Sequence, residues 1–353
     1  MPTTKVLFLL KRRPDFDPEK HTIVGLSTGL YNSANFMNEM LNKAGIQSNL
    51  EVCVDNNYID RFVARYRPTT VIIEALWVVP PKFLILSKLH PTVNWIIRIH
   101  SDMPFLASEG NSMDWIAEYV KHPNIIVAPN SPRMFQELRF YLSHLNNWSE
   151  EKLNEKVVYL PNYYPQDYAL KPLQLQDDYI NISCFGAVRP LKNQLLQAIA
   201  AVKFADSIGR KLKFHINSGR VEMKGEPVLN NLLSLFQHLA DKGHELISHE
   251  WRPRDEFLEL CAKMDIGLQV SFNETFNIVG ADHISQGIPI VGSTEIPWAD
   301  PKFCANPVDS VDIYSKLHLA LSNSDLNCQS HKELLTKYTD LTEKYWLEYF
   351  GKK

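Results

Sequence analysis

Two basic residues close to a glycine form the first candidate binding element of the sequence. Arg189 and Lys192 follow Gly186 at the end of the apolar run 180–185, and a helical pattern begins at residue 193. A glycine at a strand end allows close approach of a ligand, and two cations beside a helix N-terminus make an anion site. A diphosphate is the natural occupant, because its charge is costly to desolvate without partners. The alternative is a basic pair that solvates a loop.

Two acidic residues form the second candidate element. Glu274 lies in a loop that enters a helix, and Asp282 follows eight residues later, which predicts a position about two turns along one face. Two acids at that spacing can bind two separate sets of hydroxyl groups. An acid near a helix N-terminus also complements the helix dipole, so a capping role is the alternative for Glu274.

Short apolar runs alternate with helical patterns along the chain, which is typical of a parallel sheet buried on both faces. The predicted strands are 6–10, 49–54, 70–74, 95–99, 125–128 and 157–160 in the first half, and 180–185, 213–217, 245–249, 266–270 and 288–291 in the second. Pro161, Pro165 and Pro172 mark a linker between the halves. The sequence therefore predicts an α/β protein with two doubly wound domains, whose ligands bind outside the carboxyl ends of the strands.

The composition is that of an ordinary globular protein. The chain has 353 residues, 37 Lys and Arg against 40 Asp and Glu, and five cysteines with no C-x-x-C pair. A net charge of −3 argues against a protein that coats nucleic acid by bulk charge, and the cysteine pattern indicates reduced thiols. The sequence has no signal-peptide core and no apolar run of membrane-spanning length. It therefore predicts a cytoplasmic location, or the host cytoplasm for a viral protein.

Motifs of several other enzyme classes are missing from the sequence. No G-x-G-x-x-G follows the first strand, which disfavours a nicotinamide dehydrogenase, and there is no P-loop, H-E-x-x-H or G-x-S-x-G motif. The histidines show no zinc-ligand spacing. Asp15 and Asp17 have the spelling of a metal-binding D-x-D, but they lie between Pro14 and Pro18 and are interpreted as a solvated turn. No metal site is predicted.

The segment from Phe185 to Val291 resembles the donor domain of the GT-B-fold glycosyltransferases, most closely glycosyltransferase family 4. Gly186 to Lys192 matches the family's G-x5-K loop. The family's E-x7-E element and the positions that follow it are matched in register by Glu274, Phe276, Asp282, Gly287, Pro289 and Val291. The sequence departs from the family pattern twice, because the second acid is Asp282 rather than Glu and residue 277 is Asn where Gly is usual.

The first half resembles the same family more loosely. Residues 25–45 resemble its glycine turn and first helix, 99–102 its strand-end His motif, and 160–162 its Pro-Asn linker. The resemblance implies two Rossmann-like domains that face a central cleft. Residues 1–165 would bind the acceptor and 173–329 the nucleotide-sugar donor, while the helix of 330–353 would cross back onto the first domain.

The resemblance implies transfer of a sugar from a nucleotide diphosphate donor, expected to be a UDP-sugar, with retention of configuration and without a divalent metal or cofactor. Arg189 and Lys192 would stabilise the leaving diphosphate, Glu274 would hold the hydroxyls of the donor sugar, and His100 would face the transferred sugar. The implied donor contacts are Gly29 near the diphosphate, Gly186, Asn277, Ile278, Val279, and Asp282 on the ribose. A structural histidine at position 100 and a simple turn glycine at position 29 are the alternatives.

Basic residues around the first strand bear on the acceptor. Residues 1–100 contain twelve Lys and Arg against eight Asp and Glu, a net charge of +4. The predicted acceptor contacts are Lys11, Arg12, Arg13 and Asp102, with solvated surface charge as the alternative. Three acceptor classes are open: a polysaccharide or lipid-linked glycan, a hydroxymethylated pyrimidine in duplex DNA of the bacteriophage type, and a small molecule. A catalytically silent nucleotide-sugar binding protein and a UDP-sugar epimerase are alternative functions on the same fold.

Overall fold

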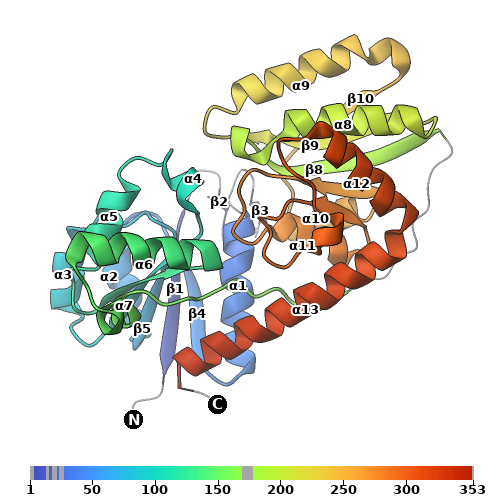
Figure 1. Ribbon diagram of the computed structural model, residues 1–353. Coiled ribbons are helices and arrows are strands. Elements are labelled where there is room, and N and C mark those ends of the chain that lie inside the picture. The colour runs from blue at the N-terminus through green and yellow to red at the C-terminus, as the bar shows by residue number, and fades with distance from the viewer. Residues whose placement is uncertain (1–3, 13–15, 18–21, 24–27, 169–177, 352–353) are drawn as a thin grey trace. The chain divides into compact units, whose positions relative to one another are not determined.

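The computed structural model describes residues 4–12, 16–17, 22–23, 28–168 and 178–351 (Figure 1). By their contacts, these residues form two compact units. The first unit contains the described residues of Met1–Pro14, Gly29–Pro165 and Thr339–Lys353, and the second contains those of Asp15–Thr28 and Gln166–Tyr338. Each unit has its own parallel sheet and its own hydrophobic core.

The sheet of the first unit has the strand order β4-β1-β5-β6-β7. Its strands are β1 (Lys5–Lys11), β4 (Gln47–Cys53), β5 (Thr70–Glu74), β6 (Asn94–Ile99) and β7 (Ile125–Pro129). Phe8 of β1 lies opposite Leu50 of β4 and Ile72 of β5. Leu7 belongs to one buried cluster and Phe8 to another, because successive side chains of a strand point to opposite faces. Both faces are therefore covered, which explains the unbroken apolar runs of the sequence.

The helices of the first unit follow its strands. They are α1 (Thr28–Lys43), α2 (Tyr58–Tyr66), α3 (Lys82–Leu89), α4 (Met103–Leu106), α5 (Ser112–Tyr119), α6 (Pro132–Asn146) and α7 (Glu150–Lys156). The sequence analysis predicts neither α6 nor α7, although Ser131 and Ser149 cap them by accepting bonds from the amides of Met134 and Lys152. The predicted strand at 157–160 is wrong, since only an isolated bridge joins Val157 to β7.

The sheet of the second unit has the strand order β10-β9-β8-β11-β12. Its strands are β8 (Tyr179–Val188), β9 (Lys211–Val221), β10 (Glu245–His249), β11 (Ile266–Gln269) and β12 (Ile290–Gly292). Its helices include α8 (Gln194–Ser207), α9 (Glu226–His238), α10 (Arg254–Cys261), α11 (Ile278–Ser285) and α12 (Ser310–Ser322), with short 3₁₀ turns η1 (Pro190–Lys192), η2 (Ala240–Lys242) and η3 (Pro301–Phe303). A small antiparallel pair, β2 (Phe16–Asp17) and β3 (Thr22–Ile23), is assigned to the same unit.

The last helix, α13 (Ser324–Tyr349), is continuous in Figure 1 and ends in the first unit. Trp346 near its end is fully buried, lies 6.0 Å from Phe8 between ring centroids, and donates its Nε1–H to the carbonyl of Pro161 at 2.9 Å. The prediction that the C-terminal helix crosses back onto the first domain is confirmed. None of the described helices combines the length and apolar character needed to cross a bilayer.

Candidate functional site

The topology of the second unit brings both candidate elements to one edge of its sheet. The strand order reverses at β8, with β9 and β10 on one side and β11 and β12 on the other. Ligands of doubly wound sheets bind at this switch point, outside the carboxyl ends of the strands. The chain leaving β8 carries Arg189 and Lys192, and the chain leaving β11 carries Glu274. The amide of Phe272 donates to the carbonyl of Leu191 at 2.9 Å and ties the two segments together.

Gly186 has a backbone conformation that glycine adopts most easily. Its φ is +116°, and the pairing of β8 with β9 is irregular between Ser183 and Ala187. The Gly186 amide donates to Oδ1 of Asn217 at 3.0 Å. A side-chain carbon at position 186 would lie 3.5 Å from Cε of Lys192, an ordinary van der Waals distance. The φ rather than lack of space therefore favours glycine here, where the strand bulges.

Buried amide side chains fix the loop that carries the cations. Gln194 donates to the carbonyl of Ala187 at 3.0 Å, and Gln197 donates to the carbonyl of Lys192 at 2.8 Å. Asn193, with a φ of +57°, donates to the carbonyl of Val270 at 3.1 Å. Each amide satisfies a backbone group that would otherwise be buried without a partner. The sequence analysis missed these residues, whose signal is a run of polar amides at the start of an apolar helix.

Lys192 and Glu274 form a shielded ion pair. The distance between Nζ of Lys192 and Oε1 of Glu274 is 2.5 Å, and their side chains are 10% and 8% exposed. The pair joins the two predicted elements directly. Because both groups are largely removed from water, their charges balance each other at the site itself, and either one is costly to leave alone.

Arg189 also lies beside a carboxylate. Its Nη1 is 3.7 Å from Oε2 of Glu222, which also accepts hydrogen bonds from Arg220. The Arg189 side chain is 21% exposed, so it is more accessible than Lys192. The site thus presents two cations, each next to an acid, at the switch point of the sheet. An anionic ligand can compete with those acids for the cations.

Asn277 explains one departure from the family pattern. It is the N-cap of α11 with a φ of +63°, a conformation that favours Gly or Asn. Its Oδ1 accepts from the amide of Gly280 at 2.7 Å, and its Nδ2 donates to Oε1 of Gln269 at 2.9 Å. The amides of Ile278 and Val279 in the first helical turn have no acceptor within the helix, and helix N-terminal amides of this kind can bind an anion.

Asp282 lies on the second turn of α11 and is 3% exposed. Its Oδ1 accepts from Nη1 of Arg254 at 2.7 Å. Because α11 begins at Ile278, Glu274 is not helical, and the prediction that the two acids share one helical face is wrong. The sequence analysis also missed Arg254, whose signal is a basic residue at the start of a helix near the predicted edge.

His283, next to Asp282, is structural. It is fully buried, its Nδ1 lies 2.8 Å from the carbonyl of Val279, and its Nε2 lies 2.7 Å from Oγ of Ser183. The Nδ1–H therefore donates to the carbonyl, and Nε2 accepts from the serine. Burial lowers the pKa of His283 to about 4, so the ring is neutral near pH 7.

In the first unit, His100 belongs to a buried charge network at the carboxyl end of β6. Its Nε2 contacts the carboxylate of Glu74, and its Nδ1 lies 3.3 Å from Nδ2 of Asn130. Nη1 of Arg98 lies 3.2 Å and 3.3 Å from the two carboxylate oxygens of Glu74, and Arg98 also donates to Oδ1 of Asn162. Glu74 and Arg98 are fully buried, whereas the His100 side chain is 14% exposed.

The charge states of this network follow from its burial. Burial raises the pKa of Glu74, but the charge of Arg98 and the hydrogen bond from His100 outweigh it, and the pKa lies below its usual value. Burial lowers the pKa of His100, which Glu74 only partly offsets. The ring is therefore neutral near pH 7, donates its Nε2–H to Glu74 and accepts from Asn130 at Nδ1. Sequence reasoning missed Glu74 and Arg98, although a charge inside each apolar run was visible.

The remaining predicted residues of the first unit have different surroundings. Asp102 is the N-cap of α4, is 1% exposed, and accepts from Oγ of Ser131 at 2.5 Å. Lys11 and Arg12 are exposed at the end of β1, next to the switch point between β1 and β5. Gly29 lies in the first turn of α1, so its prediction as a loop residue is wrong.

Some predicted residues cannot be placed. Arg13, Asp15 and residues 24–27 lie outside the described residues, as does the side chain of Asp17. Among the residues that the structure does describe, no group of three or more His, Cys, Asp or Glu is arranged to hold a metal ion.

Solved structures provide the match that sequence comparison does not. The chain matches no protein-family model and no curated protein. A sucrose-phosphate synthase from Thermosynechococcus elongatus has a TM-score of 0.68 at 11% identity, with 98% of each chain covered. OtsA in its apo form gives 0.68 at 12% identity over 98% of each chain, and Anabaena HepE in complex with UDP and glucose gives 0.64 at 12% over 99% of each. The chain has the GT-B fold. At 11–12% sequence identity, the similarity to these structures shows the fold alone.

Proposed function

We propose that this protein is a nucleotide-sugar-dependent glycosyltransferase. The observation that carries the proposal is the paired arrangement of Lys192 with Glu274 and Arg189 with Glu222 at the switch point of the second sheet. The cations fit a diphosphate, and the carboxylate of Glu274 fits sugar hydroxyls. The GT-B fold supports this reading, since one structure of that fold, HepE, is a complex with UDP and glucose. A UDP-sugar is the proposed donor, and the cytoplasm the proposed location.

Donor binding would exchange the partners of the site. The diphosphate would take Lys192 and Arg189, and Glu274, released from Lys192, would accept hydrogen bonds from the sugar. The amides of Ile278 and Val279 at the start of α11 would add the positive end of the helix dipole. Asp282 would reach the ribose with Arg254 beside it.

Catalysis would come from charge that grows during the reaction. As the glycosidic bond to the diphosphate breaks, negative charge develops on the leaving oxygen, and fixed cations stabilise that state more than the ground state. Fixed cations would take the place of a divalent metal at the leaving group, and retention of configuration is proposed on the family resemblance alone. His100, whose side chain is 14% exposed, would face the transferred sugar, with Glu74 holding the ring in one tautomer.

The test is release of UDP from a panel of UDP-sugars. Wild-type protein is expected to release UDP with one of them, faster with an acceptor than without, while Lys192→Ala releases far less. The exposed Lys121→Ala is the matched control, since Lys121 is 59% exposed and pairs with Glu118 on the surface. UDP binding without release would favour the silent binding protein, and acceptor-independent release from a UDP-N-acetylhexosamine alone would favour the epimerase.

The dependence of acceptor binding on salt concentration distinguishes the acceptor classes. A modified duplex DNA would bind through phosphates, so its affinity should fall steeply as salt increases. A neutral glycan or small molecule should show a flat profile. The exposed Lys11 and Arg12 are the described residues whose replacement by Ala should reduce the salt dependence if DNA is the acceptor.

A further inference from the structure

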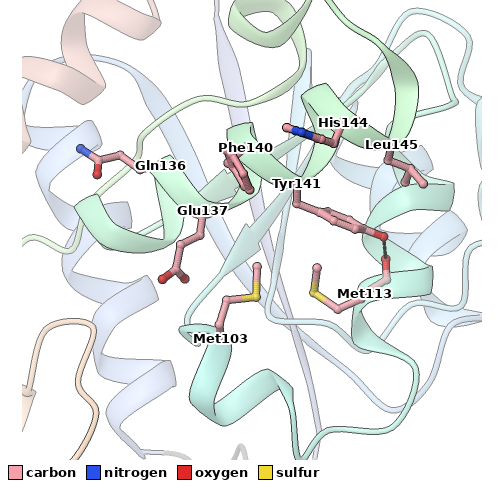
Figure 2. Close-up of a pocket in the computed structure, with 8 residues that line it drawn as sticks. All are labelled: Met103, Met113, Gln136, Glu137, Phe140, Tyr141, His144 and Leu145. Atoms are coloured by element: carbon pink, nitrogen blue, oxygen red, sulfur yellow. Dashed lines mark hydrogen bonds between the residues drawn. The ribbon is translucent and has the colours of Figure 1, made fainter.

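The first unit contains a groove that the proposed donor site does not use. It lies between α6 and the short helices α4 and α5, and has a volume of about 780 Å³. Figure 2 shows Met103 of α4 and Met113 of α5 facing side chains of α6 across it. Because α4 and α6 follow strands β6 and β7, both helices start at the carboxyl edge of the sheet, and Ser131 hydrogen-bonds Asp102 to join their starts.

Most of the groove's wall is apolar and accessible. Phe140 is 69% exposed and Leu145 51% exposed, whereas Met103, Met113 and Tyr141 are half-buried. The Tyr141 hydroxyl lies 3.5 Å from the carbonyl of Met113, drawn as a dashed line in Figure 2. Thioether and aromatic side chains accommodate irregular apolar groups. Among the described residues, no Lys or Arg lines this groove, so it is not built for a phosphate.

One carboxylate oxygen in the groove points to a hydrogen-bond donor. Oε2 of Glu137 is shielded from solvent and accepts no hydrogen bond within the described part of the chain. Figure 2 shows the Glu137 side chain directed toward Met103 rather than along the outer face of α6. Burial and then the charge of Asp102 raise the pKa of Glu137, while Arg133, one turn earlier on α6, acts in the opposite direction. A buried acceptor without a partner costs stability unless a ligand supplies the donor.

We infer that this groove binds the apolar part of an uncharged amphiphilic alcohol, with Glu137 accepting a hydrogen bond from one of its hydroxyl groups. The inference rests on the proposed function, in which the first unit binds the acceptor, and it names the acceptor's class. An aliphatic or aromatic group would lie along Phe140 and the two methionines. Duplex DNA does not fit, because the groove repels phosphate through Glu137 and offers no Lys or Arg among its described lining residues.

Binding is tested with octyl glucoside below its micelle concentration, with methyl glucoside and octyl phosphate as counterparts. Spectra of the methionine methyl groups locate the ligand, since Met103 and Met113 should shift and the buried Met264 of the second unit should not. Octyl glucoside should bind roughly tenfold more tightly than hexyl glucoside, because two more methylenes are buried. Equal binding of methyl glucoside or of octyl phosphate would overturn the inference.

Variants on the surface separate the groove from non-specific binding. Phe140→Ser should weaken the binding of octyl glucoside at least tenfold, and Glu137→Gln should weaken it a few-fold. Leu84→Ser on α3 is the matched control, because Leu84 is 57% exposed and lies outside the groove. An equal loss in the control would overturn the inference. UDP titrated into the same samples keeps the two proposals distinct. Binding of UDP without binding of octyl glucoside would overturn only the proposal for the groove. Binding of octyl glucoside without binding of UDP would overturn only the proposal for the donor site.

Discussion

Lys192 and Glu274, 82 residues apart in the chain, place Nζ and Oε1 2.5 Å from each other at the edge of the second sheet. Neither side chain is more than 10% exposed. The pair therefore has two consequences that can be measured separately, one for folding and one for the proposed reaction. Removing one partner leaves a shielded charge, whereas removing both leaves none.

A double-mutant cycle measures this coupling. Lys192→Met and Glu274→Gln should each lower the free energy of unfolding by about 3 kcal/mol, and the double variant should recover most of that loss. UDP release should fall about 100- to 1,000-fold in Lys192→Met and should not recover in the double variant. Urea denaturation and UDP release are the two measurements. Additive losses of stability would show that the pair is not coupled, and Lys121→Met, on an exposed pair, should change stability by less than about 1 kcal/mol.

The N-cap of α11 gives a second prediction, on the backbone. Asn277→Gly keeps the left-handed conformation but loses both the cap and the hydrogen bond to the buried Gln269, so it should cost about 2 kcal/mol. Asn277→Ala loses the same two hydrogen bonds and adds the strain of a φ of +63° on a residue with a Cβ, for a total of about 3 kcal/mol. Thermal unfolding of the two variants compares them directly. Equal losses would mean that the side chain alone, not the backbone conformation, decides the residue at this position.

The buried network of the first unit gives a third prediction. Arg98→Met leaves Glu74 without its main counter-charge in a fully buried position, and should lower the free energy of unfolding by about 3–5 kcal/mol. Arg98→Met combined with Glu74→Gln should be more stable than the single variant. Chemical denaturation of both proteins makes the comparison. If the double variant is the less stable of the two, the carboxylate is held by groups other than Arg98.

The proposed absence of a metal requirement gives a fourth prediction. Because fixed cations would stabilise the leaving group, EDTA should not change the rate of UDP release. Turnover before and after chelation, with Mg²⁺ and Mn²⁺ added back, is the measurement. A rate that collapses with EDTA and returns with one ion would contradict the proposal and would direct attention to Asp15 and Asp17.

Much of the fold could be predicted because both sheets are parallel and covered on both faces. Runs such as 6–10 and 125–128 are apolar without alternation, and this distinguishes them from amphipathic helices. Predicting the strands also predicted where they end, and therefore that Lys192 and Glu274 lie at one edge of the second sheet. Helix α6 was missed, although Met134, Leu138 and Leu142 recur every four residues and Ser131 with Pro132 marks its start.

The contacts within the site could not be predicted, because they depend on which strand ends become neighbours. Nothing in the local sequence pairs Asp282 with Arg254 or His100 with Glu74, which are 28 and 26 residues apart. The sequence did contain one unused signal, the charges of Glu74 and Arg98 within apolar strands. A charge in a buried strand requires a partner of opposite sign, so the two residues implied each other.

The last prediction concerns acid pH. Burial lowers the pKa of His283 and of His331 to about 4 and that of His215 to about 3, below the value of about 6.5 in an unfolded chain. Between those values the unfolded state binds more protons than the folded state, so stability is lost as the pH falls below about 6.5. Each histidine adds up to about 1.4 kcal/mol per pH unit to that slope, and none adds to it well above pH 6.5.

His331→Leu should reduce the loss of stability per pH unit by the contribution of one histidine, because the side chain that takes up a proton on unfolding is gone. Its Nδ1 lies 2.9 Å from the carbonyl of Asn327, so the variant also loses a hydrogen bond, and its stability at pH 7.5 should be lower by about 1 kcal/mol. The quantity to compare is therefore the change in unfolding free energy per pH unit, not its value at one pH. Urea denaturation at several pH values between about 7.5 and 5 gives it. The exposed His238→Asn is the control and should run parallel to the wild type, and a parallel curve for His331→Leu would show that this histidine does not titrate on unfolding.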